Sequence, residues 1–166
     1  MSEPAPRTAH FDGLRIRYDS TKSFGEVVAA LKDDVGQEPV AIEAIGAATT
    51  DWESYRERVQ AHVGPSGFML FATFDHGGWI AKAGIDRNLL RVIIGNPLIA
   101  ITMLRHDLTA GLFAPVELLV VGEDTGGCSV TYVQPSSLMV VESNPSLLAA
   151  ARELDAKLAG LVTAIT

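Results

Sequence analysis

Residues 67–138 read GFMLFATFDHGGWIAKAGIDRNLLRVIIGNPLIAITMLRHDLTAGLFAPVELLVVGEDTGGCSVTYVQPSSL. Apolar runs in this stretch are separated by glycines and prolines, and at its centre Asn96 and Pro97 divide two of them. The run 89–94 is typical of a strand, and the run 98–105 of a helix. Asn is a favourable N-cap because its side-chain oxygen accepts from a free backbone N–H, and Pro is favourable at the first helical position. The motif therefore predicts a strand-to-helix corner.

The apolar runs around this corner predict further elements. Residues 68–75 are almost continuously apolar and too short for a helix between glycine-rich breakers, so we expect a central strand there. A helical turn is predicted at 79–83. Residues 116–121 and 128–133 are expected to form two strands, joined by a hairpin turn at 123–127.

Segments further out add one strand and two helices. Apolar and charged residues alternate over 14–19, which is typical of a half-buried strand. Ser23 and Glu26 have the spacing of a capping box, so a helix should begin there and end near Gly36. Leucine and alanine residues recur every three or four positions over 147–161, which predicts a long amphipathic C-terminal helix.

The order of these elements predicts the fold class. Pro39–Glu43 is interpreted as a short edge strand, and a charged amphipathic helix is expected at about 52–63. Strand pairs that alternate with helices indicate an α+β fold, with an antiparallel sheet of about four to five strands and helices packed on one face. Residues 1–12 are expected to form a loose N-terminal arm, and residues 13–166 a single α+β domain.

Composition excludes several classes of function. The 166 residues carry a net charge of −7, and the basic residues are scattered, which argues against a nucleic-acid partner. No run approaches the roughly 20 apolar residues of a membrane span, and the N-terminus has no apolar signal core, so we expect a cytoplasmic protein without a membrane partner. Cys128 is the one cysteine. Phosphate-binding, dinucleotide-binding and Ser-nucleophile motifs are absent from the sequence, and we expect no metal and no cofactor.

Two polar motifs are candidate sites. A helix start such as that at Asn96 and Pro97 has free N–H groups that bind anions or polarise a carbonyl, although capping alone accounts for both residues. Asp75 and His76 end the strand before them, and neighbours on a strand point to opposite faces, so a triad-like Asp–imidazole bond needs the turn to redirect one. The simpler interpretation is a turn in which Asp75 bonds the backbone. His76 nevertheless lies near Trp79 at a loop rim.

Other features have simpler explanations. Glu117 is a carboxylate in a strand of core composition, and we interpret it as an outward-facing residue. Cys128 has no basic neighbour in sequence to activate it. The predicted helix Leu98–Leu104 has Thr102 as its one polar residue. A helix that is apolar all round must be covered on more than one side, so a homodimer interface through this helix is expected.

The ordered motifs resemble the bacterial and archaeal family called domain of unknown function 302. The matching features are Gly67-Phe68, Phe71, Asp75-His76, Ala83-Gly84, Ile94-Gly95-Asn96-Pro97, Gly111, Pro115, Tyr132, Pro135 and Leu138. The resemblance implies a TATA-binding-protein-like domain, in which a curved antiparallel sheet grips helices, and frequent dimers; it implies no activity. Two departures stand out: Gln37–Ser66 is inserted before the Gly-Phe strand, and Ala114-Pro115 stands where members often have Leu-Pro.

Three functions remain open at this level. The leading hypothesis is a non-catalytic homodimeric protein that binds a small apolar ligand between sheet and helix, with contacts from Asp75, His76, Trp79, Asn96 and Pro97. It requires a cavity beneath the corner, since ligand pockets combine apolar walls with a few polar groups. The second is an enzyme with His76 as acid or base near the Asn96 helix start, which requires the two to converge. The third is a structural or assembly domain.

Overall fold

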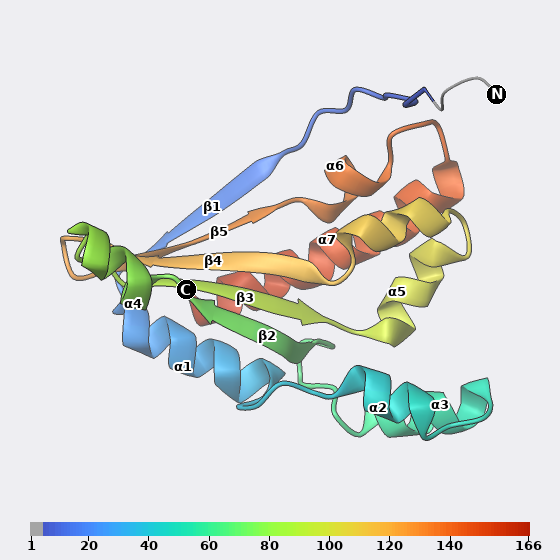
Figure 1. Ribbon diagram of the computed structural model, residues 1–166, viewed down its shortest axis with the longest axis horizontal. Helices are drawn as coiled ribbons and strands as arrows, with labels where there is room; N and C mark the ends of the chain where they lie inside the picture. The colour runs from blue at the N-terminus through green and yellow to red at the C-terminus, as the bar shows by residue number, and fades with distance from the viewer. Residues whose placement is uncertain (1–4) are drawn as a thin grey trace.

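One antiparallel sheet organises the protein, in a computed structural model that describes residues 5–166. Its strands follow the order β1-β5-β4-β3-β2, and every neighbouring pair is antiparallel (Figure 1). The strands are β1 (Arg15–Ser20), β2 (Met69–Asp75), β3 (Leu89–Gly95), β4 (Val116–Gly122) and β5 (Cys128–Val133). The predicted α+β class with an antiparallel sheet is confirmed.

Helices of very different length surround the sheet. They are α1 (Phe24–Val35), α2 (Ile42–Ala47), α3 (Trp52–Gln60), α4 (Gly77–Ile80), α5 (Pro97–Leu104), α6 (Pro135–Met139) and α7 (Pro145–Ile165), with 3-10 turns η1 (Ala81–Ala83) and η2 (Leu108–Phe113). The α2–α3 pair lies beyond the end of β2, beside α5, and α7 runs the length of the sheet behind it (Figure 1).

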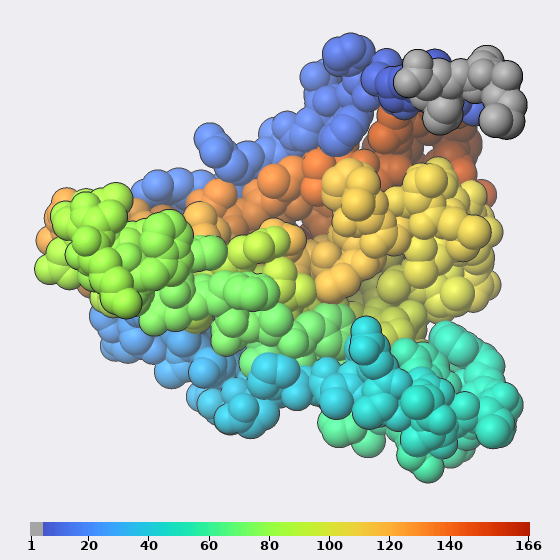
Figure 2. Space-filling model, in the orientation of Figure 1, coloured from blue at the N-terminus to red at the C-terminus, as the bar shows by residue number. Residues whose placement is uncertain are grey.

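The two faces of the sheet differ because side chains alternate along each strand. In β4, Val116, Leu118 and Val120 are buried, whereas Glu117 between them is exposed. The buried side packs on α1 and α7. In the view of Figure 2, α7 lies behind the sheet, so the face turned toward the reader is the one that these two helices leave open.

Local capping signals are confirmed where the sequence predicted them. The Ser23 hydroxyl accepts from the Glu26 N–H at 3.3 Å, and the Glu26 carboxylate accepts from the Ser23 N–H at 2.7 Å. Helix α1 ends at Gly36, whose φ of +107° lies in the region that favours glycine. These contacts fix the ends of α1 without help from distant residues.

The edge strand expected at Pro39–Glu43 is wrong. Val40 donates one backbone hydrogen bond to the carbonyl of Leu70, at 2.8 Å, and the chain then turns into α2. Apart from Glu43, the residues of α2 are apolar, and a Cβ at Gly46 would lie 3.9 Å from the Tyr55 ring, so α2 packs closely on α3. Helix–helix packing thus replaces strand pairing. The helix expected at about 52–63 is present and ends at Gln60.

Two short elements were not predicted. The segment 108–113 forms η2, which begins at Asp107, whose carboxylate accepts from the Thr109 N–H at 2.8 Å. Pro135 ends β5 as expected, but it also occupies the first position of α6. An Asp N-cap and a Pro at the first helical position are the same residue types that begin the longer helices, so each of these short elements has a local signal in the sequence.

Candidate functional site

The predicted site residues lie at opposite ends of the β2–β3 pair. Met69 is the register partner of Gly95 at one end, and Asp75 is the partner of Leu90 at the other. Six residues of strand separate the ends, which is about 20 Å at the usual rise per residue. The structure therefore places Asn96 and Pro97 far from Asp75, His76 and Trp79, and the convergence that the enzyme hypothesis required does not occur.

At the first end, Asn96 acts as a structural link. Its side-chain oxygen accepts from the Leu98 N–H at 2.8 Å, and its amide nitrogen donates to the Gly67 carbonyl at 2.8 Å. The residue is 8% exposed, and Pro97 follows at the first position of α5. The capping interpretation is confirmed. Each end of the amide therefore has a structural partner, and one N–H and one lone pair of the oxygen are left.

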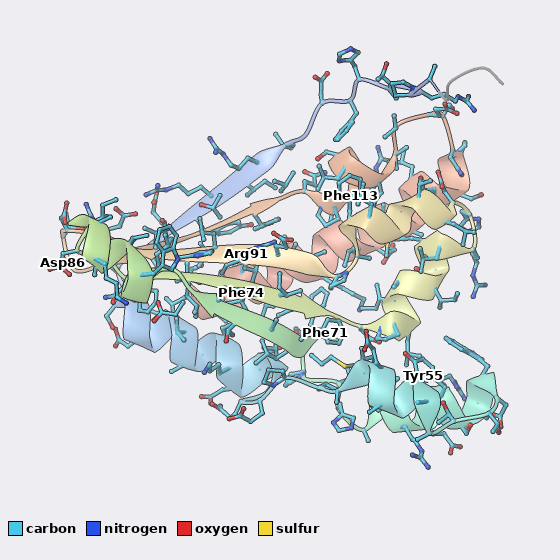
Figure 3. All side chains as sticks on the ribbon, viewed as in Figure 1. Tyr55, Phe71, Phe74, Asp86, Arg91 and Phe113 are labelled. Carbon is cyan, nitrogen blue, oxygen red and sulfur yellow. The ribbon has the colours of Figure 1, made fainter. Side chains whose placement is uncertain are left out.

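A cavity of about 240 Å³ lies against this corner. It is bounded by the end of the sheet, by α5, by α7 and by the α2–α3 pair. Ile42 and Tyr55 reach it from α2 and α3, and Figure 3 shows Tyr55 between these helices and α5, with Phe71 nearby on β2. Among its other apolar walls are Phe68, Ile99, Met103, Val116 and Leu154. None of the described residues that line it is acidic, basic or histidine.

A bulge and a glycine position Phe71 at the cavity wall. The β2–β3 register shifts between Leu70 and Ala72, and such bulges redirect a side chain. A Cβ at Gly95 would lie 2.8 Å from the Phe71 ring and 3.0 Å from the Pro115 Cβ. Gly95 is therefore required by close packing, because any larger residue would displace the ring that closes this side of the cavity.

Tyr55 supplies the hydroxyl at the cavity. The Asp51 carboxylate caps α3 by accepting from the Ser54 N–H at 2.8 Å, which fixes the first turn of the helix. The Tyr55 ring lies beside Trp52, with ring centroids 5.8 Å apart. Burial raises the pKa of Tyr55 above its ordinary value near 10, so the hydroxyl keeps its proton at neutral pH. The amphipathic pattern predicted over 52–63 does not indicate what the Tyr55 side chain faces.

At the other end, Asp75 and His76 form turn contacts. Asp75 accepts from the Gly78 N–H at 3.1 Å, as the turn interpretation predicted. The Trp79 indole N–H donates to Nδ1 of His76 at 3.1 Å, and the two rings meet edge to face. No hydrogen bond joins Asp75 to His76 within residues 5–166, so the pair lacks the geometry of a catalytic dyad.

The surface at this end is an open, polar groove of about 640 Å³. Asp75 and Asp86 line it together with Arg87, which donates to the Gly122 carbonyl at 3.1 Å and forms an ion pair with Asp124. Trp79 is 59% exposed beside it. Figure 3 shows Asp86 at the end of the molecule that is remote from Tyr55. The polar groups of this groove thus form contacts within the protein.

The remaining candidates have structural roles. Glu117 is exposed and binds Arg91 through two contacts of 2.9 and 2.5 Å, so the outward-facing interpretation is confirmed. Arg91 also lies 5.6 Å from the centre of the Phe74 ring. Cys128 is buried, and burial raises the pKa of its thiol, which disfavours the reactive thiolate.

Among residues 5–166, no group of three or more His, Cys, Asp or Glu side chains is arranged to hold a metal ion. In the same residues, no helix has the length and apolar character needed to cross a bilayer.

Comparisons with known proteins agree with this fold. Residues 46–165 match the model of the family Domain of unknown function DUF302. The crystal structure of an uncharacterized conserved DUF302 protein from Bacillus stearothermophilus is similar to this chain, with a TM-score of 0.64 and 18% sequence identity. The likeness covers 92% of this chain and 98% of that one, and shows a shared fold. No curated protein matches the sequence.

Proposed function

This chain belongs to the DUF302 family, and we propose that it binds one small, largely apolar molecule in the cavity at the Asn96 corner. The cavity carries the proposal. A closed apolar cavity of about 150 Å³ takes benzene; the cavity here has a volume of about 240 Å³ and is open to solvent on one side, and it has room for a molecule of one or two rings. Of the five ligand contacts predicted from the sequence, Asn96 and Pro97 line this cavity, whereas Asp75, His76 and Trp79 do not.

The lining favours binding over catalysis. General acid–base chemistry needs a group that exchanges a proton near neutral pH, and nucleophilic chemistry needs an activated hydroxyl, thiol or amine. The described polar side chains that line the cavity are Tyr55, whose pKa is raised, and Asn96, whose amide does not exchange a proton near neutral pH and bonds the backbone at both its oxygen and its nitrogen. His76 lies at the opposite end of β2. The geometry thus supports a binding protein rather than the enzyme alternative.

A cavity-filling substitution tests this function. Ala100 lines the cavity from α5, so Ala100→Phe places a ring inside it. Ala156→Phe is the matched control, because Ala156 is exposed on α7. In a calorimetric titration with naphthalene, we expect saturable binding by the wild type and by Ala156→Phe, and none by Ala100→Phe. Equal binding by all three proteins, or no binding by the wild type, would contradict the proposal.

We also propose self-association as a homodimer near α5. Inside the chain, α5 already packs on α3, α7 and η2, which covers much of its apolar surface. The adjacent η2 leaves Leu108 and Leu112 exposed by 83% and 81%, which favours an interface there. Light scattering should give a dimer mass for the wild type and a monomer mass for Leu112→Glu; a monomeric wild type rejects the interface. A cytoplasmic location stays a prediction.

A further inference from the structure

The lining of the Asn96 cavity restricts the charge of its ligand. No described side chain around it carries a charge at neutral pH. An ion that enters an apolar site without a partner loses its hydration and gains little in return, so charged molecules are strongly disfavoured. Carboxylates, phosphates, amines and metal ions are therefore poor candidates. An uncharged molecule fits this lining.

Among its described residues, the same lining contains one polar side chain without a partner. The Asn96 amide already bonds the Leu98 N–H and the Gly67 carbonyl, which hold it in its structural role. The Tyr55 hydroxyl forms no hydrogen bond within residues 5–166, and in that part of the chain no unpaired polar side-chain atom is sealed away from solvent. This hydroxyl is thus both unpartnered and accessible to solvent, and it belongs to a side chain that lines the cavity.

A ligand that covers this hydroxyl must satisfy it. The hydroxyl has a hydrogen to donate at neutral pH, because the ordinary tyrosine pKa is near 10 and burial raises the pKa of Tyr55 further. If an apolar ligand covered this donor, it would be left unpaired, which is unfavourable. A ligand with an acceptor atom at that point avoids the loss. The aromatic rings of Phe68 and Phe71 offer flat surfaces for the rest of the molecule.

We propose that the ligand is an uncharged compound of one or two rings with one hydrogen-bond acceptor, and that Tyr55 selects it by donating to that acceptor. The proposal rests on the binding function proposed for the cavity. Tyr55 and Ile42 both come from the segment Gln37–Ser66, so that segment determines the ligand preference of this chain. Tyr55 binds and discriminates; it takes no part in a reaction.

Two compounds of the same shape test the selection. Quinoline and isoquinoline differ from naphthalene by one ring nitrogen, which is an acceptor. We compare the wild type with Tyr55→Phe, which keeps the ring and removes the hydroxyl. The ratio of the Kd of naphthalene to that of the better nitrogen compound should fall about fivefold in Tyr55→Phe, the value expected for one neutral hydrogen bond. Tyr18→Phe, on β1 beside Tyr132, should leave the ratio unchanged.

The outcomes separate this proposal from the function on which it rests. If naphthalene binds, Ala100→Phe blocks it, and Tyr55→Phe leaves the ratio unchanged, the role of Tyr55 is wrong and the cavity function stands. If the wild type binds none of the three compounds, the cavity function fails and the selection by Tyr55 fails with it. An equal fall of the ratio in Tyr18→Phe also overturns the assignment, because that residue lies outside the cavity.

Discussion

The two ends of the β2–β3 pair are built from neighbouring residues of the same two strands, yet they are opposite in character. At the Asn96 end, apolar side chains from four helices and the sheet enclose a cavity of about 240 Å³. At the Asp75 end, acidic side chains and glycines line a polar groove of about 640 Å³. Asn96 caps a helix at one end and Asp75 caps a turn at the other, so a capping residue does not distinguish the two ends. They differ because apolar side chains from distant elements converge at the Asn96 end.

This difference changes where function is expected. Histidine next to aspartate attracts attention in a sequence, but here the pair belongs to a solvated turn, with the His76 ring bonded to Trp79. The Asn96 end has fewer reactive groups and a more apolar lining. Binding affinity for an apolar molecule depends on the removal of apolar surface from water, so the less reactive end is the better site.

The largest expected contrast is in stability. Asn96→Ala removes the cap of α5 and leaves the Gly67 carbonyl without its donor, so we expect a loss of about 2–4 kcal/mol in the free energy of unfolding. Asp75→Ala removes one exposed turn contact and should cost about 1 kcal/mol or less. Urea denaturation measures both. Similar losses would show that the Asn96 corner is no more integral to the fold than the turn.

The next contrast compares two phenylalanines on β2. Phe71 packs against Gly95 at the cavity, and Phe71→Ala should cost about 1–3 kcal/mol, somewhat less than a fully buried Phe. Phe74 is 48% exposed beneath Arg91, and Phe74→Ala should cost about 1 kcal/mol or less. Phe71→Ala should also weaken naphthalene binding, whereas Phe74→Ala should not. If Phe74→Ala lowers the free energy of unfolding more than Phe71→Ala does, then the placement of Phe71 at the cavity and of Phe74 on the exposed face of the sheet is wrong.

The smallest effect concerns pH. The folded state raises the pKa of Tyr55, so below the unfolded value near 10 its stabilising contribution is fully present, and it is lost as the pH rises through the folded value. Tyr55→Phe lacks this titration. Its free energy of unfolding should therefore fall less between pH 9 and pH 11 than that of the wild type, in urea denaturation at each pH. Parallel curves would mean that Tyr55 is not buried as described.

Much of the fold could be predicted because its signals are local. The capping pairs at Ser23 and Asn96, and the apolar run that became β2, each depend on residues within one turn or strand. The exception among local signals is Pro39–Glu43, which bonds β2 once and then joins α2. There a preference for packing two helices, set by Tyr55 against Gly46, outweighed strand pairing.

The site could be predicted only in part, because it is assembled from distant segments. The sequence indicated the Asn96 corner and the need for a cavity beneath it. It grouped Asp75, His76 and Trp79 with that corner, and the antiparallel register separates them from it. Tyr55 was missed because its contact with α5 depends on how the α2–α3 pair folds back. No periodicity within one helix reports what lies opposite its buried face.

One titration tests the central claim most directly: naphthalene added to ¹⁵N-labelled wild-type protein, followed in ¹H–¹⁵N spectra. The account predicts that the signals of the Asn96 side-chain amide and the Ala100 backbone shift and saturate, while the indole N–H of Trp79 stays unchanged. Saturable shifts at Trp79 and Gly78, with the Asn96 and Ala100 signals unmoved, would place binding at the polar end and contradict it.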